Sequence, residues 1–114
     1  MKEGNIQGGL ADLRHALAIF ESTLSSDAGN DFAFSGAAET YSGMGFADAA
    51  LAASQNMPSA QRTQHWLEAE AYYNKSLEIW LQMRDRGALA RIDADKPEQI
   101  AKAIAKRHEG LRLR

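Results

Sequence analysis

Residues 66–80 read WLEAEAYYNKSLEIW, and their apolar and small side chains recur at alternating steps of three and four residues. This spacing places a stripe along one face of a helix, made by Trp66, Ala69, Tyr73, Ser76, Trp80 and Met83. Pro58 suits the start of such a helix, and Gly87 suits the left-handed residue that closes one. The pattern therefore predicts a helix over residues 59–86.

Two more helices are predicted before this stretch. Residues 3–24 carry a stripe with the same spacing, made by Ile6, Leu10, Leu13, Leu17, Phe20 and Leu24. Asn30 follows a run of small polar residues and can cap a second helix over residues 31–56. A bend or a break at Gly43-Met44-Gly45 is an alternative to one continuous second helix, because glycine weakens a helix interior.

A fourth helix is predicted after the central stretch. Asp95-Lys96-Pro97-Glu98 has the pattern of a capping box, which would open a helix over residues 97–111. Its narrow apolar edge consists of Ile100, Ile104 and Leu111. No run in the chain alternates with a period of two, so the sequence predicts an all-α fold in a single domain, residues 1–114.

An internal repeat links the first and third predicted helices. The order small, large, small, leucine occurs in residues 9–17 and again 60 residues later in residues 69–77, as Gly9, Leu13, Ala16 and Leu17, then Ala69, Tyr73, Ser76 and Leu77. This order resembles the second helix of a tetratricopeptide repeat, although the usual period is about 34 residues. In the second predicted helix, the positions that carry tryptophan, leucine, glycine and tyrosine in such repeats are Phe34, Ala37, Ala38 and Tyr41.

Residues 66–89 also resemble the last repeat of tetratricopeptide regions attached to bacterial serine/threonine protein kinases. The kinase itself is absent, because Asp31-Phe32-Ala33 lacks the glycine of the metal-binding tripeptide and no catalytic His-Arg-Asp occurs. The resemblance implies antiparallel helix-turn-helix repeats. One complete helix pair would follow an orphan N-terminal helix and precede a C-terminal capping helix.

The same resemblance implies a protein-binding function. In such repeats the first helices line a concave surface that takes an extended or helical peptide. On this sequence that surface would comprise Phe32, Ser35, Glu39 and Ser42. We therefore expect a non-catalytic scaffold for an unknown protein or peptide, with a self-assembling helical bundle as the alternative.

Motifs for catalysis and metal binding are weak. Asp12 with His15, and His65 with Glu68, each place a carboxylate and an imidazole one helical turn apart, as di-metal bundles do. Each is a single pair, so contacts on a helix surface are the favoured interpretation. Gly43-Met44-Gly45 lacks the third glycine and the preceding strand of a nucleotide-binding loop. The sequence predicts no enzyme, no cofactor and no metal site.

Composition narrows the function classes further. The chain of 114 residues is 45% hydrophobic and 25% charged, as ordinary globular domains are. It has no cysteine, which excludes disulfides and thiolate zinc sites and favours a reducing compartment, the cytoplasm. No apolar run approaches the roughly 20 residues that span a bilayer, and no signal-peptide core follows the first residues.

Charge is divided unevenly along the chain. Residues 1–57 hold two basic and seven acidic residues, a net charge of −5, whereas residues 58–114 hold eleven basic and eight acidic residues, a net charge of +3. This positive excess is too small to indicate nucleic acid. The basic side chains near the C-terminus are interpreted as solvating a terminal helix: Lys102, Lys106, Arg107, Arg112 and Arg114.

The charge division and the first stripe together predict a homodimer. If the helix over residues 3–24 is the second helix of a repeat whose first helix is missing, one side of its stripe from Ile6 to Leu24 has no partner in its own chain. A second copy would then cover that stripe.

Overall fold

The computed structural model describes the backbone of residues 3–54 and 56–112, and the side chains of residues 5–54 and 56–106. Within these backbone ranges the chain forms four α-helices and a short 3₁₀ turn, with these bounds: α1 Glu3–Ser26, α2 Asp31–Ala52, α3 Ser59–Asp85, η1 Arg91–Asp93 and α4 Lys96–Arg112. Since the described ranges contain no strand, the predicted all-α fold class is confirmed.

The helix ends lie where local chemistry favours them. Asn30 caps α2 by accepting a hydrogen bond at its Oδ1 from the Ala33 backbone N–H, at 2.9 Å. Gly87 follows α3 with φ of +72°, and the Ala88 N–H donates to the Met83 carbonyl at 2.8 Å. The two predicted caps are confirmed, while α2 ends at Ala52, earlier than the expected residue 56.

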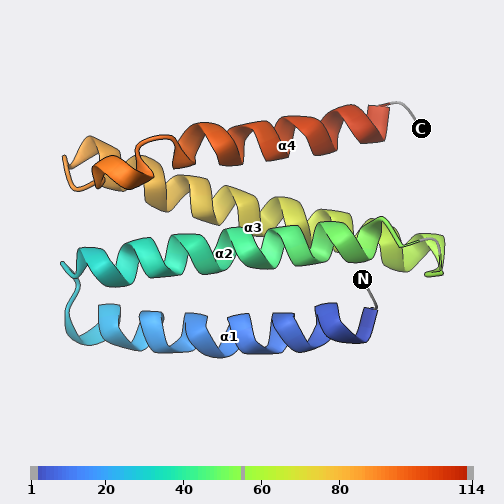
Figure 1. The fold of residues 1–114 in the computed structure, drawn as a ribbon, viewed down its shortest axis with the longest axis horizontal. Helices are drawn as coiled ribbons and strands as arrows, with labels where there is room; N and C mark the ends of the chain where they lie inside the picture. Colours follow the sequence, from blue (N-terminus) through green and yellow to red (C-terminus); the bar gives the residue numbers. More distant parts are fainter. Residues whose placement is uncertain (1–2, 55, 113–114) are drawn as a thin grey trace.

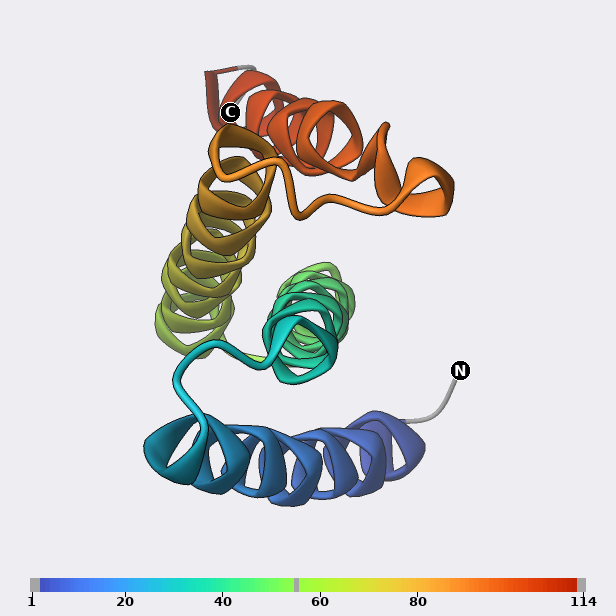
Figure 2. The same cartoon turned by 90° about the vertical axis from the view of Figure 1, so that its left-hand side faces the viewer.

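Consecutive helices run antiparallel (Figure 1), and α2 and α3 form the middle of the molecule between α1 and α4 (Figure 2). The extensive helix contacts in the described residues join α1 with α2, α2 with α3, and α3 with α4. Each helix therefore packs mainly against its neighbours in sequence.

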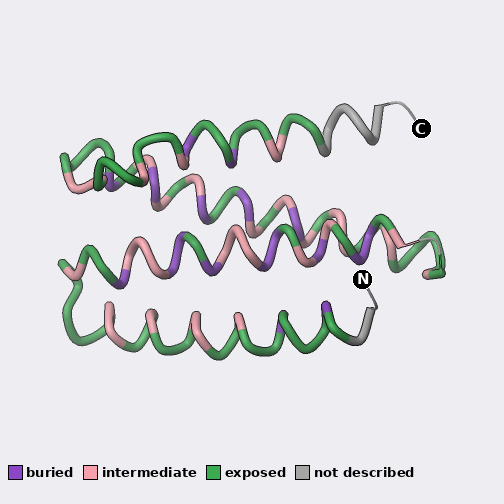
Figure 3. The backbone as a smooth tube through the Cα atoms, viewed as in Figure 1, coloured by how far each residue is buried: buried purple, intermediate pink, exposed green. Residues whose placement is uncertain are grey.

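The core consists of two clusters that meet on α2 and α3. One joins α2, α3 and α4 through the buried residues Ala38, Ala69, Tyr73, Trp80, Met83 and Ile100. The other joins α1 and α2 through Ile6, Leu10, Met44 and Leu51. Figure 3 shows the buried positions recurring along α2 and α3. The stripe of the central stretch is a packing face, as its spacing predicts, although Trp66 is only half-buried.

Glycines in α2 admit aromatic rings from the neighbouring helices. A Cβ atom added at Gly45 would lie 2.7 Å from the Tyr73 ring of α3, and one added at Gly36 would overlap the Phe20 ring of α1. On the same side of α2, the Ser76 hydroxyl of α3 donates to the Ala38 carbonyl at 2.7 Å. Because α2 continues through Gly43 and Gly45, these glycines serve close helix packing and do not break the helix.

The α1 stripe has a partner in its own chain, the helix α2. Ile6 and Leu10 are buried against Met44 and Leu51 of α2. The remaining stripe residues, Leu13, Leu17, Phe20 and Leu24, are half-buried. The helix that follows α1 therefore buries the N-terminal end of the stripe and covers the rest of it in part.

The copy of the internal repeat in α1 also packs differently from the copy in α3. Ala69 and Ser76 of α3 are fully buried where α2 approaches. Gly9, the counterpart of Ala69, is exposed, and a Cβ atom added there would meet nothing within 4 Å. Similar residue types at the same spacing are therefore buried to different extents in the two helices. The apolar edge of α4 keeps Ile100 buried and Ile104 half-buried, while Leu111 lies outside the described side chains.

Candidate functional site

The predicted partner-binding residues lie on one side of α2, and two of them are accessible. Phe32 is 79% exposed, and Glu39, nearly two helical turns later, is also exposed. Ser35 and Ser42 are half-buried, and their hydroxyls donate to carbonyls of their own helix, those of Asp31 at 3.1 Å and Glu39 at 3.0 Å. Phe32 and Glu39 are therefore the members of this set most available to a partner.

Sequence reasoning missed a third accessible residue on this side of α2. Phe46 is 56% exposed and follows Glu39 by seven residues, the same interval that separates Phe32 from Glu39. Seven residues are nearly two full helical turns, so the three side chains lie on one face. We refer to Phe32, Glu39 and Phe46 as the α2 face. The signal available in the sequence was the pair of phenylalanines fourteen residues apart, Phe32 and Phe46.

Neighbouring helices hold the two phenylalanines at the edges of the core. The Phe32 ring meets the Phe20 ring of α1 edge-on with centroids 6.4 Å apart, and the Phe46 ring meets the Tyr73 ring of α3 at 5.3 Å. Each ring thus has one packed side and one side open to solvent. Such half-supported aromatic side chains are typical of binding surfaces.

The charge around the α2 face is acidic and partly neutralised. Residues 31–52 contain three acidic residues and no lysine or arginine. Arg86 lies 3.3 Å from Asp31 at the start of the helix, and Lys96 of α4 lies 3.9 Å from Glu39. Because these are exposed pairs, each contributes little to stability and can exchange for a partner's cation.

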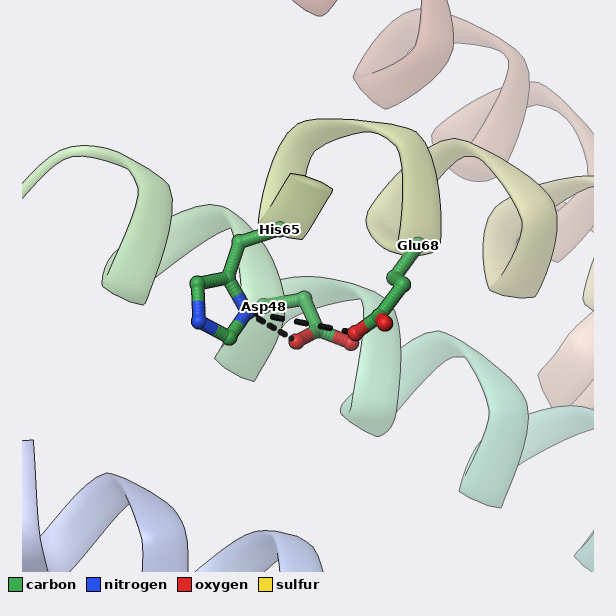
Figure 4. A group of neighbouring side chains, drawn as sticks. All are labelled: Asp48, His65 and Glu68. Atoms are coloured by element: carbon green, nitrogen blue, oxygen red, sulfur yellow. Dashed lines mark hydrogen bonds and ion pairs between the residues drawn. The ribbon is translucent and has the colours of Figure 1, made fainter. Parts of the chain in front are cut away.

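A second group of side chains joins α2 to α3 near the other end of α2. His65 and Glu68 lie one turn apart on α3, and Asp48 of α2 points at both (Figure 4). His65 Nδ1 is 2.9 Å from Asp48 Oδ1 and 3.9 Å from Glu68 Oε2. The sequence paired His65 with Glu68 alone, and the structure adds Asp48 as a third member.

Asp48 is the most buried acidic residue of this group. Its accessible surface is 0%, and its Oδ2 atom has no hydrogen-bond partner. Burial raises the pKa of Asp48 above its ordinary value, and the nearby Glu68 carboxylate adds to that rise. The hydrogen bond to His65 and the positive charges of His65 and Arg14 oppose the rise. The surroundings of Asp48 therefore stabilise the charged form of its carboxyl group poorly.

The other predicted carboxylate and imidazole pair is not part of a comparable group. Asp12 and His15 are both exposed on α1. In the described residues, Asp48, His65 and Glu68 form a set whose possible ligand atoms all lie within 4.8 Å of one another.

Comparisons with protein-family models, with curated proteins and with solved structures found no match. None of the described helices is both long enough and apolar enough to cross a membrane.

Tyr73 and Trp80 of α3 are poorly placed to stack on nucleic-acid bases, because they are 3% and 0% exposed. In the basic C-terminal group, Lys102 and Lys106 are exposed, while the side chains of Arg107, Arg112 and Arg114 lie outside the described residues.

Proposed function

We propose that this chain is a non-catalytic protein-interaction module that binds a basic, amphipathic peptide segment across the α2 face. The observation that carries the proposal is the exposure of Phe32 and Phe46, at 79% and 56%, on the face of a helix whose other sides pack against α1 and α3. Aromatic anchors on a rigid helix are the residues that most often dominate binding energy.

The resemblance to tetratricopeptide repeats supports the same surface. In that interpretation α2 and α3 are the first and second helices of one repeat and α4 is the cap. The small-residue contacts between α2 and α3, at Gly45 with Tyr73 and at Ala38 with Ser76, suit such a pair. The first helix of the repeat then carries the binding surface, and that helix is α2.

The chemistry of the α2 face indicates what the partner carries. Phe32 and Phe46 are 14 residues apart, which corresponds to about 21 Å along a helix. A partner segment would place one apolar side chain against each ring. A lysine or arginine between them would face Glu39, and the acidic N-terminal half of the chain would attract such a segment.

A synthetic amphipathic helix of leucine and lysine is a suitable probe, with its binding followed by fluorescence anisotropy. We expect Phe32→Ser combined with Phe46→Ser to weaken binding at least about tenfold, because both anchors are removed. Ile92→Ser is the control for loss of an exposed apolar side chain, since Ile92 is 85% exposed and belongs to η1, not to the α2 face.

Binding that survives the double substitution, or that Ile92→Ser weakens equally, would contradict the proposal. Light scattering on the same variants tests the alternative of self-assembly. A chain of twice the expected mass that becomes monomeric in the double variant would mean that the α2 face pairs with a second copy, and the peptide proposal would be rejected.

A further inference from the structure

Asp48, His65 and Glu68 bring two carboxylates and one imidazole together at the junction of α2 and α3 (Figure 4). The side chains of the three residues are exposed to solvent to different extents. The Asp48 side chain is 1% exposed, that of His65 19% and that of Glu68 39%. The group is therefore closed on the α2 side and open to solvent on the Glu68 side.

The buried Asp48 carboxylate lacks a complete set of partners. Its Oδ1 atom lies 2.9 Å from His65 Nδ1, while its Oδ2 atom has no hydrogen-bond partner. In Figure 4 this carboxylate lies between the imidazole and the Glu68 carboxylate. A buried acceptor oxygen without a donor is unfavourable, and a second carboxylate nearby increases the negative charge. The group is thus short of positive charge.

We infer that Asp48, His65 and Glu68 bind a divalent transition-metal ion, with Zn²⁺ the best fit. One imidazole nitrogen and two carboxylate oxygens are ligands that Zn²⁺ accepts, and three protein ligands leave a fourth position for water. The imidazole favours Zn²⁺ over Mg²⁺ and Ca²⁺, which prefer oxygen ligands alone.

The possible ligand atoms lie within 4.8 Å of one another, so zinc binding requires the His65 and Asp48 atoms to move slightly apart and Glu68 to move inward. Ligand atoms on one tetrahedral zinc ion lie about 3.4 Å apart, given bonds of about 2.0–2.2 Å. His65 Nδ1 is already 2.9 Å from Asp48 Oδ1 and 3.9 Å from Glu68 Oε2. Glu68 is the most exposed of the three and can swing inward, although its Oε1 atom accepts a hydrogen bond from Gln64 Nε2 at 3.2 Å.

Binding exchanges protons for the ion. A metal ion can occupy His65 Nδ1 only when that nitrogen carries no proton, and it binds both carboxylates in their charged form. Zinc affinity should therefore fall as the pH is lowered. The competing explanation is a proton shared by the two carboxyl groups, which would complete the group without any metal.

Calorimetric titration of the untagged chain with zinc chloride distinguishes the two explanations. We expect one ion per chain, and a rise of about 10 °C in the thermal midpoint at a hundredfold excess over the dissociation constant. Magnesium chloride at the same concentration should leave the midpoint unchanged. Asp48→Asn, His65→Gln and Glu68→Gln should each weaken zinc binding at least about tenfold.

His15→Gln is the matched control, because Asp12 and His15 form an exposed carboxylate and imidazole pair on α1. This substitution should leave zinc affinity unchanged. Glu68→Gln keeps the side-chain volume at a half-exposed position, so it tests the site even if Asp48→Asn fails to fold. Absence of zinc binding, binding that Glu68→Gln leaves intact, or equal weakening by His15→Gln would overturn the metal site in favour of the shared proton.

Discussion

Tyr73 packs its ring over Gly45 and under Phe46, so its phenol is held inside the α2 and α3 junction. Burial, with a smaller contribution from the Asp48 charge, raises the pKa of Tyr73 to about 12 from a usual 10.0. The folded chain therefore holds this proton more tightly than the unfolded chain. The resulting stabilisation is complete below pH 10 and is lost as the pH rises towards 12.

This linkage predicts a specific loss of stability in alkali. We expect Tyr73→Phe to reduce the fall in unfolding free energy between pH 9 and pH 12, because phenylalanine has no proton to lose. Urea unfolding at a series of pH values measures the effect. Tyr72→Phe is the control for removal of a tyrosine, and an equal change in both variants would refute the assignment to Tyr73.

Asp48 shows what a single sequence does not reveal at the residue scale. It stands 17 residues before His65, on a different helix, so no local spacing relates the two. It lies four residues after Met44 and three before Leu51, a spacing that is typical of a packing residue on one helix face. An acidic residue in an otherwise apolar stripe was the available sign, and only the pairing of α2 with α3 identifies the imidazole that it meets.

At the scale of elements, periodicity predicted each helix but not which neighbour covers it. The bounds of α3 agree with the prediction to one residue, because proline and glycine punctuate both ends. The α1 stripe was correctly placed on one face, yet a stripe does not state its partner. That partner is α2, whose small residues and glycines accept α1 on one side and α3 on another.

The two kinds of glycine in these helices lead to opposite expectations for alanine. Gly45→Ala should destabilise the chain by about 1–3 kcal/mol, because the added methyl group would push against the Tyr73 ring. Gly9→Ala is the matched control. It lies in open space on α1 and should stabilise the chain by up to about 1 kcal/mol through helix propensity. Thermal unfolding of both variants measures the two shifts, and a stabilising Gly45→Ala would show that α2 and α3 can separate without loss.

At the scale of the whole molecule, α4 closes one end of the core. Ile100 is 4% exposed and packs in the cluster that contains Trp80 and Met83. Truncation after Asp93 should lower the thermal midpoint by at least about 8 °C, since loss of one such isoleucine corresponds to about 2 kcal/mol or more. Truncation after Lys106 keeps Ile100 and Ile104 and is the control. Equal midpoints for the two truncated chains would show that α4 is dispensable for the core.

The succession of helix contacts, α1 with α2, α2 with α3 and α3 with α4, also bears on how the chain acquires its structure during synthesis. Each helix emerges from the ribosome directly after the helix it packs against, so no segment has to wait for a distant partner. The intervening loops are short, and their closure removes little chain entropy. Translation can therefore assemble the molecule in order from its N-terminus, with α1 shielded once α2 has formed and the Trp80 cluster completed when α4 arrives last.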